Sequence, residues 1–559
     1  MPLLFLESAT DEAVSKQKGI TPLSRSGVTS ASDIKLNKIA TNGNDRPGLE
    51  HTTTGSSIGS TVARLNSNTN TDNVLFPFRI KHLGHDVYTL YAATPQSRQE
   101  WCNKIIEAKT RHAKALFSQN AEPFRLRVLA DISFGYDSAT AGNRPAGVSV
   151  RGTPLDRAIR ELEKVYGPSS RPSPVCRATV NCATGFTAFG KSIIAIGTDY
   201  GVYISDATDP RGWRRVSFDS VPLFTRTGTN QSKTVQIQKV TQIAVLEEFS
   251  VCLILSERSL ISYPLDVVAP VSNYPAPAHD NSRRAPQRLA KDVTYFATAR
   301  MKERMLLFYK KKEGMHTTFK VLEPVFQKST EKKTRLFNRK GVTGATESFR
   351  DFDEFYMPTE CYSLNIFQTY IAVSTAKGIE LLTLDKKQPM SIPDLKQQAI
   401  ANIAGRIRDQ RPLGMFKLND QEFLLTYEDC AVYVDKHGDV SRTLIMEYSG
   451  TQKKARGATM YGQYLLLFNE DYVEVRNAEN GRLRQIIAGR DVRCLDYGIR
   501  GPTPPTTLGQ AAAANNWGAA QANPVELSKG TVKIAMSHPE IPGMQIVLEM
   551  LLNDGHTEN

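Results

Sequence analysis

Short apolar runs, joined in pairs by polar turns, fill most of the chain after residue 176. Each pair has a strand-like apolar run, a turn rich in Gly, Asp, Asn or Ser, and a second apolar run, which is the pattern of a β-hairpin. Six pairs follow this plan, at residues 193–204, 251–263, 305–319, 370–382, 423–434 and 464–475. Their starts lie roughly 40 to 65 residues apart, a period typical of the four-stranded blades of a β-propeller.

The tail of the chain supplies a further pair of strand-like runs, at 531–536 and 544–551, beyond a flexible Pro-, Ala- and Asn-rich stretch at 501–524. With this pair the pattern predicts an all-β fold, a seven-bladed β-propeller over residues 176–552, followed by a tail at 553–559. We expect the strand within 176–188 to pair with the tail and close the ring, because closure removes exposed sheet edges.

The N-terminal region, residues 1–117, reads as a separate small unit. Residues 20–73 are rich in Ser, Thr, Asn and Gly, and we expect a disordered insertion there because they bury too little apolar surface to offset the entropy of ordering. Strand-like runs at 74–80 and 87–92 follow, and they predict a hairpin.

A helix is expected directly after this hairpin. Thr94 and Pro95 predict its start, with the threonine as N-cap and the proline at the first helical position. Trp101, Ile105 and Ala108 then share one face of the helix. We expect Trp101 to be the buried anchor of the small unit.

Residues 118–175 read as a connector with one short helix. Pro and Gly recur between short apolar runs, which is typical of chain that lies on a neighbouring surface. Thr153 and Pro154 predict the start of a helix that ends near Tyr166 and docks by its apolar face. A second amphipathic segment, at 392–407, predicts a helix that either caps a propeller face or binds a partner, and capping is the favoured interpretation.

The composition indicates a cytoplasmic protein. The net charge of +13 and pI near 9.2 permit an acidic protein, an anionic membrane surface or a nucleic acid as partner, and select none of them. The seven cysteines include no C-x-x-C pair, which indicates reduced thiols. The N-terminus lacks the features of a secretory signal, and no apolar run reaches the roughly 20 residues of a membrane-spanning helix. We therefore expect any membrane contact to be peripheral.

Two stretches match catalytic motifs only in their letters. Residues 185–192 fit the phosphate-binding loop G-x-x-x-x-G-K-[ST], but a β-rich run follows where a helix must begin. Residues 55–59 fit G-x-S-x-G, but they lie in the low-complexity insertion. The nine histidines form no H-E-x-x-H motif. We therefore expect no enzymatic activity, no cofactor and no metal site.

Three separated segments resemble the citron homology (CNH) domain, a propeller-type binding module. They read IAIGTDYGVY (194–203), FLLTYEDCAVYVDKHGDVSR (423–442) and YVEVRNAENGRL (472–483). Upstream, YTLYA (88–92) and SRQEW (97–101) resemble the last third of a pleckstrin homology domain. In that family the phosphoinositide-binding Lys and Arg lie mainly between the first two strands, which the matched residues do not include.

A partial pleckstrin homology unit followed by a CNH domain resembles the C-terminal layout of fungal Rho-type guanine nucleotide exchange factors. The resemblance implies a non-catalytic scaffold that binds a Rho-family GTPase in cell-wall integrity or polarity signalling, recruited to the plasma membrane cortex. The sequence shows no helical bundle of an exchange domain, so we expect no exchange activity from it. The alternative function is peripheral binding of membranes or phosphoinositides, and we expect no nucleic-acid partner.

Two basic clusters and one Trp-containing segment are the candidate binding residues. We place the first cluster on the turn of the third hairpin and the second on a long loop between blades, where binding residues are often found. The alternative for both is a solvated cationic loop. An exposed Trp beside arginines is typical of interfaces, but a Trp packed between blades is equally compatible with the sequence. The candidates are Lys310, Lys311, Lys312, Lys332, Lys333, Arg335, Arg211, Trp213, Arg214 and Arg215.

Overall fold

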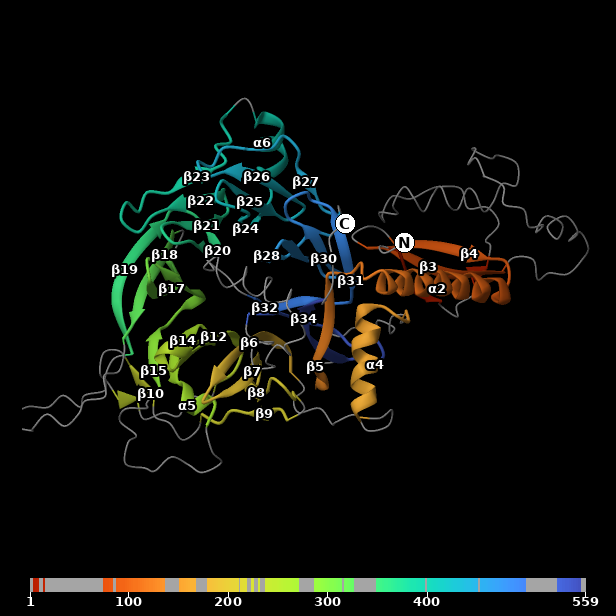
Figure 1. Cartoon of the computed structure of the whole chain (residues 1–559), viewed down its shortest axis with the longest axis horizontal. Coiled ribbons are helices and arrows are strands. Elements are labelled where there is room, and N and C mark those ends of the chain that lie inside the picture. The colour runs from red at the N-terminus through yellow and green to blue at the C-terminus, as the bar shows by residue number, and fades with distance from the viewer. Residues whose placement is uncertain are drawn as a thin grey trace, which may run out of the picture.

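The computed structural model describes most of the chain. The described residues are 4–9, 14–15, 74–83, 87–135, 150–166, 178–210, 212–218, 223–225, 230–231, 237–270, 286–313, 316–325, 348–397, 400–450, 453–498 and 530–553. They form one small N-terminal sheet and seven further sheets, which lie side by side around a common centre and are called here the ring (Figure 1). The predicted insertion at 20–73 and the flexible stretch at 501–524 lie outside the described residues.

Each sheet of the ring is built from strands that follow one another along the chain, with one exception described below. The first contains β6 (Val180–Ala188), β7 (Lys191–Thr198), β8 (Gly201–Asp206) and β9 (Arg214–Arg215). The second contains β12 (Val240–Leu246), β13 (Val251–Ser256), β14 (Ser259–Pro264) and β15 (Gln287–Ala290), with β10 (Leu223–Thr225) and β11 (Asn230–Gln231) added at its outer edge. The third contains β16 (Val293–Met301), β17 (Arg304–Glu313), β18 (His316–Pro324) and β19 (Phe349–Met357).

The next three sheets repeat this antiparallel plan. The fourth contains β20 (Cys361–Ile366), β21 (Ile371–Thr375), β22 (Gly378–Leu382) and β23 (Met390–Ile392). The fifth contains β24 (Pro412–Lys417), β25 (Glu422–Tyr427), β26 (Cys430–Asp435) and β27 (Met446–Glu447). The sixth contains β28 (Gly457–Tyr461), β29 (Tyr464–Phe468), β30 (Tyr472–Asn477) and β31 (Leu483–Ala488). The six hairpins predicted from the sequence are the second and third strands of these six sheets.

The seventh sheet, called here the closing sheet, joins the two ends of the ring. Its strands are β32 (Arg493–Tyr497), β33 (Val532–Ser537), β34 (Met544–Leu552) and β5 (Phe124–Gly135). The last of these comes from before the ring and pairs with β34 along its whole length, from Phe124↔Leu552 to Gly135↔Met544.

The closing strand predicted from the sequence was therefore wrong. The strand within 176–188 is β6, and it pairs with β7 in the first sheet. The stretch predicted to be a surface connector supplies β5 instead, because its side chains Phe124, Leu126 and Val128 are buried beside the closing and sixth sheets. The domain boundaries at 118–175 and 176–552 stay predictions.

The core of the ring lies between its sheets. Within the described residues, seven clusters of buried hydrophobic side chains each fill the space between two neighbouring sheets. One of them joins Val547 of the closing sheet to Ile194 and Ile196 of the first sheet, so the series has no gap. The innermost strands of all seven sheets line one central cavity of about 540 Å³.

The small N-terminal unit consists of one sheet and one long helix. In its sheet, β3 (Val74–His82) pairs with β4 (Val87–Ala92) on one side and with β1 (Leu4–Ala9) and β2 (Val14–Ser15) on the other. The predicted hairpin is thus confirmed. The helix α2 (Pro95–Ser118) has Thr94 as its N-cap, as predicted, because the Thr94 hydroxyl accepts a hydrogen bond from the Ser97 amide.

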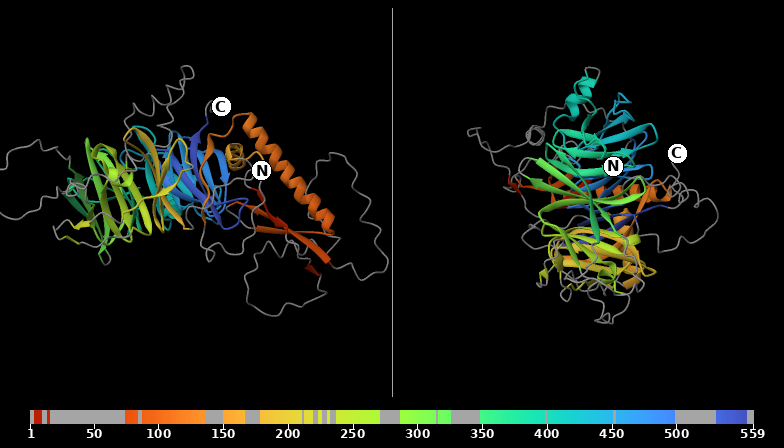
Figure 2. Two further views of the ribbon diagram at one scale, coloured as in Figure 1. Left: turned by 90° about the horizontal axis from the view of Figure 1, so that it is seen from below. Right: turned by 90° about the vertical axis from the view of Figure 1, so that its left-hand side faces the viewer.

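The predicted burial of Trp101 is wrong. Its side chain is 56 % exposed, and the buried positions of α2 are Cys102, Lys109 and Ala113. The helix is turned so that Cys102 meets Leu6 and Phe78 of β1 and β3. The apolar spacing predicted a stripe on this helix, but a neighbouring stripe faces the sheet. Figure 2 shows α2 lying outside the ring, with its C-terminal end toward it.

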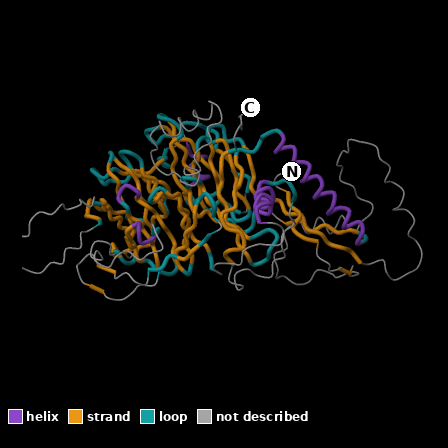
Figure 3. The backbone as a smooth tube through the Cα atoms, turned by 60° about the horizontal axis from the view of Figure 1, so that its bottom comes forward, coloured by secondary structure: helices purple, strands orange, loops and turns teal. Residues whose placement is uncertain are grey.

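Two further helices pack on the ring. The helix α4 (Pro154–Tyr166) buries Ile159 and Ala158 against the closing sheet, which confirms the predicted docking. The helix α6 (Ala401–Ile407) buries Ile403 and Ile407 against the fourth and fifth sheets, in agreement with the favoured capping role. Single-turn segments lie at η1 (Glu247–Phe249) and α5 (Leu265–Val268). Figure 3 shows how little of the described chain is helical. No helix in this described part is long and apolar enough to cross a membrane.

Candidate functional site

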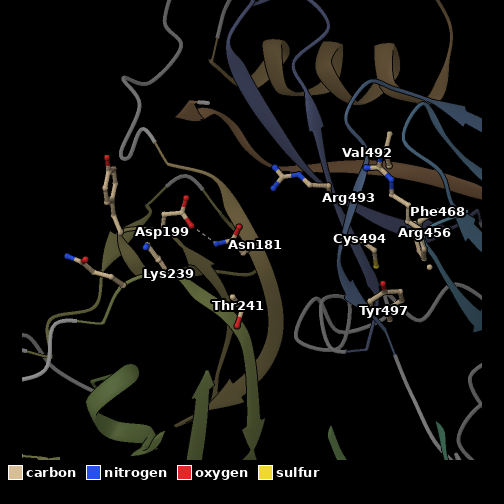
Figure 4. Close-up of a pocket in the computed structure, with 13 residues that line it drawn as sticks. Asn181, Asp199, Lys239, Thr241, Arg456, Phe468, Val492, Arg493, Cys494 and Tyr497 are labelled. Carbon is tan, nitrogen blue, oxygen red and sulfur yellow. Dashed lines mark hydrogen bonds between the residues drawn. The ribbon is translucent and has the colours of Figure 1, made fainter. Parts of the chain in front are cut away.

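A cavity of about 720 Å³ opens where the first, second, sixth and closing sheets meet (Figure 4). It adjoins the central cavity, with which it shares Asn181, Thr241, Arg456 and Tyr497. Ends of inner strands and the turns beside them form its walls. The lining residues are Asn181, Asp199, Tyr200, Gln238, Lys239, Thr241, Arg456, Gly457, Phe468, Val492, Arg493, Cys494 and Tyr497.

One wall is held rigid by Asn181, which joins the first sheet to the second. Its Nδ2 donates to Asp199 Oδ1 at 2.9 Å and to the Val240 carbonyl at 3.1 Å. Asp199 and Tyr200 form the turn between β7 and β8, and the Tyr200 amide donates to Thr198 Oγ1. The ring of Tyr200 is 50 % exposed on this fixed turn. The wall therefore presents an aromatic side chain from an ordered backbone.

The opposite wall is held by Arg493 of β32. Its Nη1 donates to the Val180 carbonyl at 2.8 Å, and its Nη2 donates to Gln545 Oε1 at 2.6 Å. Gln545 is buried and also donates to the Ala178 carbonyl. Arg493 thus ties the closing sheet to the first sheet beside the cavity.

The floor of this wall is aromatic. Tyr497 and Phe468 meet edge to face, with ring centroids 5.6 Å apart. A Cβ atom on Gly457 would lie 2.6 Å from the Tyr497 hydroxyl, so only glycine allows the ring this close to β28. Larger side chains at position 457 would displace Tyr497.

The lining carries more positive than negative charge. Lys239, Arg456 and Arg493 face one carboxylate, Asp199, which already accepts from Asn181. Lys239 is exposed, whereas Arg456 shares its guanidinium with Glu470 at 2.7 Å. Cations and an exposed aromatic ring on a rigid frame are suited to binding an acidic surface. In the described ranges, no three His, Cys, Asp or Glu side chains gather as a metal site requires.

The predicted lysine cluster lies elsewhere, on the third sheet. Residues 310–312 were expected on a turn, but they lie within β17, whose pairing with β18 continues to Glu313↔His316. The strands are longer than the apolar pattern suggested, because their last pairs are polar. Lys310 Nζ donates to the Cys361 carbonyl at 2.7 Å, which links the third sheet to the fourth. Lys311 is half-buried.

The Trp-containing segment shows a mixed outcome. Trp213 is 8 % exposed and its Nε1 donates to the Leu129 carbonyl at 3.1 Å, so it packs between the closing and first sheets. This is the second of the two alternatives considered for it. Arg214 and Arg215 are exposed on β9. The remaining candidates, Arg211, Lys332, Lys333 and Arg335, lie outside the described residues.

None of the predicted binding residues lines the cavity. Its own residues come from four sheets and meet only because the ring closes. The sequence marks 198–201 as a turn, but nothing in the sequence places that turn opposite Arg456. The binding roles of the predicted residues stay predictions.

Comparison with known proteins gives consistent relatives. The CNH domain model matches residues 190–498, which is more than half of the chain. Rho1 guanine nucleotide exchange factor 3 of Schizosaccharomyces pombe is 29 % identical over 445 residues, which cover 75 % of this chain and 32 % of that protein. Rho1 guanine nucleotide exchange factor 1 of the same organism is 28 % identical over 310 residues, covering 54 % of this chain and 21 % of that protein.

Among solved structures, the AfRom2 CNH domain matches with a TM-score of 0.46 and 20 % identity. The match covers 67 % of this chain and 94 % of that domain. The chain spans about a third or less of the length of the curated relatives named above.

Proposed function

The chain belongs to the CNH domain family, and we propose that it is the non-catalytic regulatory region of a Rho guanine nucleotide exchange factor. In this proposal it binds a Rho-family GTPase in cell-wall integrity or polarity signalling, in the cytoplasm and at the plasma membrane cortex. The exchange factors among its relatives support the signalling context. The small N-terminal unit would be the remnant of a pleckstrin homology domain.

The proposed architecture is a closed seven-bladed β-propeller. Two observations support it: each of seven sheets shares a hydrophobic cluster with both of its neighbours, and the inner strands of all seven line one cavity. A propeller holds its loops and strand ends in fixed positions, so a binding surface costs little ordering entropy when a partner arrives.

The observation that carries the binding role is the cavity beside Tyr200. It combines a rigid backbone with an exposed aromatic ring and the cations Lys239 and Arg456. Interfaces concentrate their binding energy in Tyr, Trp and Arg side chains of this kind. The matching partner surface would be acidic and would insert a polar segment between the two walls.

Calorimetric titration against a Rho-family GTPase, loaded with GDP or with a non-hydrolysable GTP analogue, tests the proposal. We expect saturable binding that weakens with salt, and Tyr200→Ala should weaken it by about tenfold or more, equivalent to ~1.4 kcal/mol. Phe189→Ala is the matched control, because Phe189 is a similarly exposed aromatic at the opposite end of β7. Absence of binding in both nucleotide states would contradict the proposal.

Peripheral membrane binding is the second candidate function. It is favoured by the exposed pair Arg214 and Arg215 on an outer strand and by the net charge of +13. Sedimentation with vesicles that contain increasing anionic lipid separates the two functions. Sedimentation that rises with anionic lipid and is lost in Arg214→Glu with Arg215→Glu would favour membranes.

A further inference from the structure

The structure assigns to Asp471 of the ring a second role, as the anchor that holds the small N-terminal unit in one orientation. Asp471 lies between β29 and β30 of the sixth sheet, outside the cavity described above. Its Oδ2 pairs with Lys81 Nζ of β3 at 2.9 Å and with Lys453 Nζ of the ring at 2.8 Å. One carboxylate therefore joins the two units.

This contact is a built site rather than a surface ion pair. The Asp471 side chain is 7 % exposed and the Lys81 side chain 16 %. The backbone around Asp471 is also fixed, because its amide donates to Asn469 Oδ1 and its carbonyl accepts from the Gly489 amide at 2.9 Å. A buried carboxylate needs its partners, so loss of one cation is costly.

The electrostatics agree with this geometry. Burial by itself would raise the pKa of Asp471, but Lys453 and Lys81 outweigh burial and hold the pKa below its usual range. The carboxylate is therefore charged at neutral pH, as the ion pairs require.

A second anchor lies at the other end of the interface, between α2 and α4. The Arg157 guanidinium lies over the Phe117 ring, 4.5 Å from its centroid. Arg157 is held in turn by Glu122 at 2.6 Å and by the Gly152 carbonyl at 2.7 Å. Because α4 is docked on the closing sheet, this contact joins α2 to the ring.

Two anchors and a short link together restrict rotation. The link between the units is residues 119–123, since α2 ends at Ser118 and the closing strand β5 begins at Phe124. A link of this length allows a swivel, and a single contact would leave it free about one axis. Anchors on β3 and on α2 remove that freedom. Figure 2 shows α4 between the ring and α2. A partner that touches both units would then meet them at one fixed spacing, whatever the ring itself binds.

Small-angle X-ray scattering of the whole chain tests this inference. We expect the wild-type curve to fit one arrangement of the two units at moderate salt. The double variant Lys81→Glu with Phe117→Ala opposes Asp471 with a second negative charge and removes the cation–π contact. Its maximum dimension and radius of gyration should increase, and a single arrangement should no longer fit.

Two variants control for charge and for folding. Lys104→Glu changes charge equally on an exposed position of α2, and Lys81→Arg keeps the cation at Asp471; both should give the wild-type curve. Unchanged thermal unfolding of the ring would show that the double variant is folded. A double variant whose curve superimposes on that of the wild type, or a wild type that itself requires many arrangements, would overturn the inference.

Discussion

The ring and the small N-terminal unit bury their hydrophobic residues in different ways. In the ring every sheet is covered on both faces by a neighbouring sheet, and the buried clusters run without a gap around the described sheets. The small unit has one sheet, one helix and a cluster in which the buried members are Leu6, Phe78 and Cys102. It also buries the amine of Lys109, which lies over the Phe5 ring at 3.5 Å.

The difference indicates which part can hold its shape alone. Fully burying one large aliphatic or aromatic side chain contributes roughly 1.5–3 kcal/mol, so the ring has a large surplus over the cost of a buried polar group. The small unit has few such side chains and depends on its anchors at Asp471 and Arg157. Damage to the ring should therefore be local and large, and damage to the small unit should be smaller.

The largest effect is expected for Tyr433→Asp in the fifth sheet. The Tyr433 side chain is 4 % exposed, its hydroxyl donates to the Ala478 carbonyl at 2.9 Å, and Arg442 lies over its ring. A carboxylate in this core should lower the free energy of unfolding by ~4 kcal/mol or more. Tyr433→Phe, which loses only the hydroxyl, should lower it by about 1 kcal/mol. Chemical denaturation distinguishes the two, and an unchanged midpoint for the aspartate variant would contradict the packing described here.

A smaller effect is expected for Arg493→Met at the seam between the closing and first sheets. The change removes the hydrogen bonds to Val180 and Gln545 and leaves buried acceptors without their donor. We expect a loss of ~2–3 kcal/mol in the free energy of unfolding. Arg456→Met is the control, because the Arg456 side chain is 62 % exposed and its ion pair with Glu470 should contribute less than about 1 kcal/mol. Equal losses for both variants would show that the seam is not special.

The smallest effect, and one of opposite sign, is expected for Lys109→Met in the small unit. Burial lowers the pKa of Lys109 to about 8 from its ordinary value of 10.5. Folding thus disfavours the charged amine, so stability of the small unit should rise as pH increases from about 8 to about 10.5, where the unfolded chain binds more protons. Methionine should remove this slope and stabilise the unit by roughly 1–3 kcal/mol at pH 7. Hydrogen exchange of residues in α2 and β3 measures it, and an unchanged pH slope in Lys109→Met would contradict the assignment.

Local patterns predicted most of the fold, and contacts between distant segments explain the failures. Apolar pairs with polar turns located the six hairpins, and Thr94 marked the start of α2. The pattern did not identify β5 as the closing strand, because its partner β34 lies at the other end of the chain. Trp101 was placed one stripe away from the buried face, because helical spacing does not say which stripe a sheet will cover.

The candidate cavity was not predicted at all. Lys239 and Arg456 belong to different sheets and line the same cavity only in the closed ring. The predicted lysines were chosen by local charge, and Lys310 proved to be a link between two sheets. Charge density along the chain therefore located neither wall of the cavity.

A pair of truncated chains tests most directly whether the ring is a unit closed by the strand that precedes it. One chain begins at residue 118 and keeps β5, and the other begins at residue 136 and lacks it. We expect the first to unfold cooperatively near the temperature of the full chain, and the second to melt on the order of 10 °C lower or to aggregate, because β34 loses its partner and Phe124, Leu126 and Val128 leave the core. Equal melting temperatures for the two chains would contradict closure by β5.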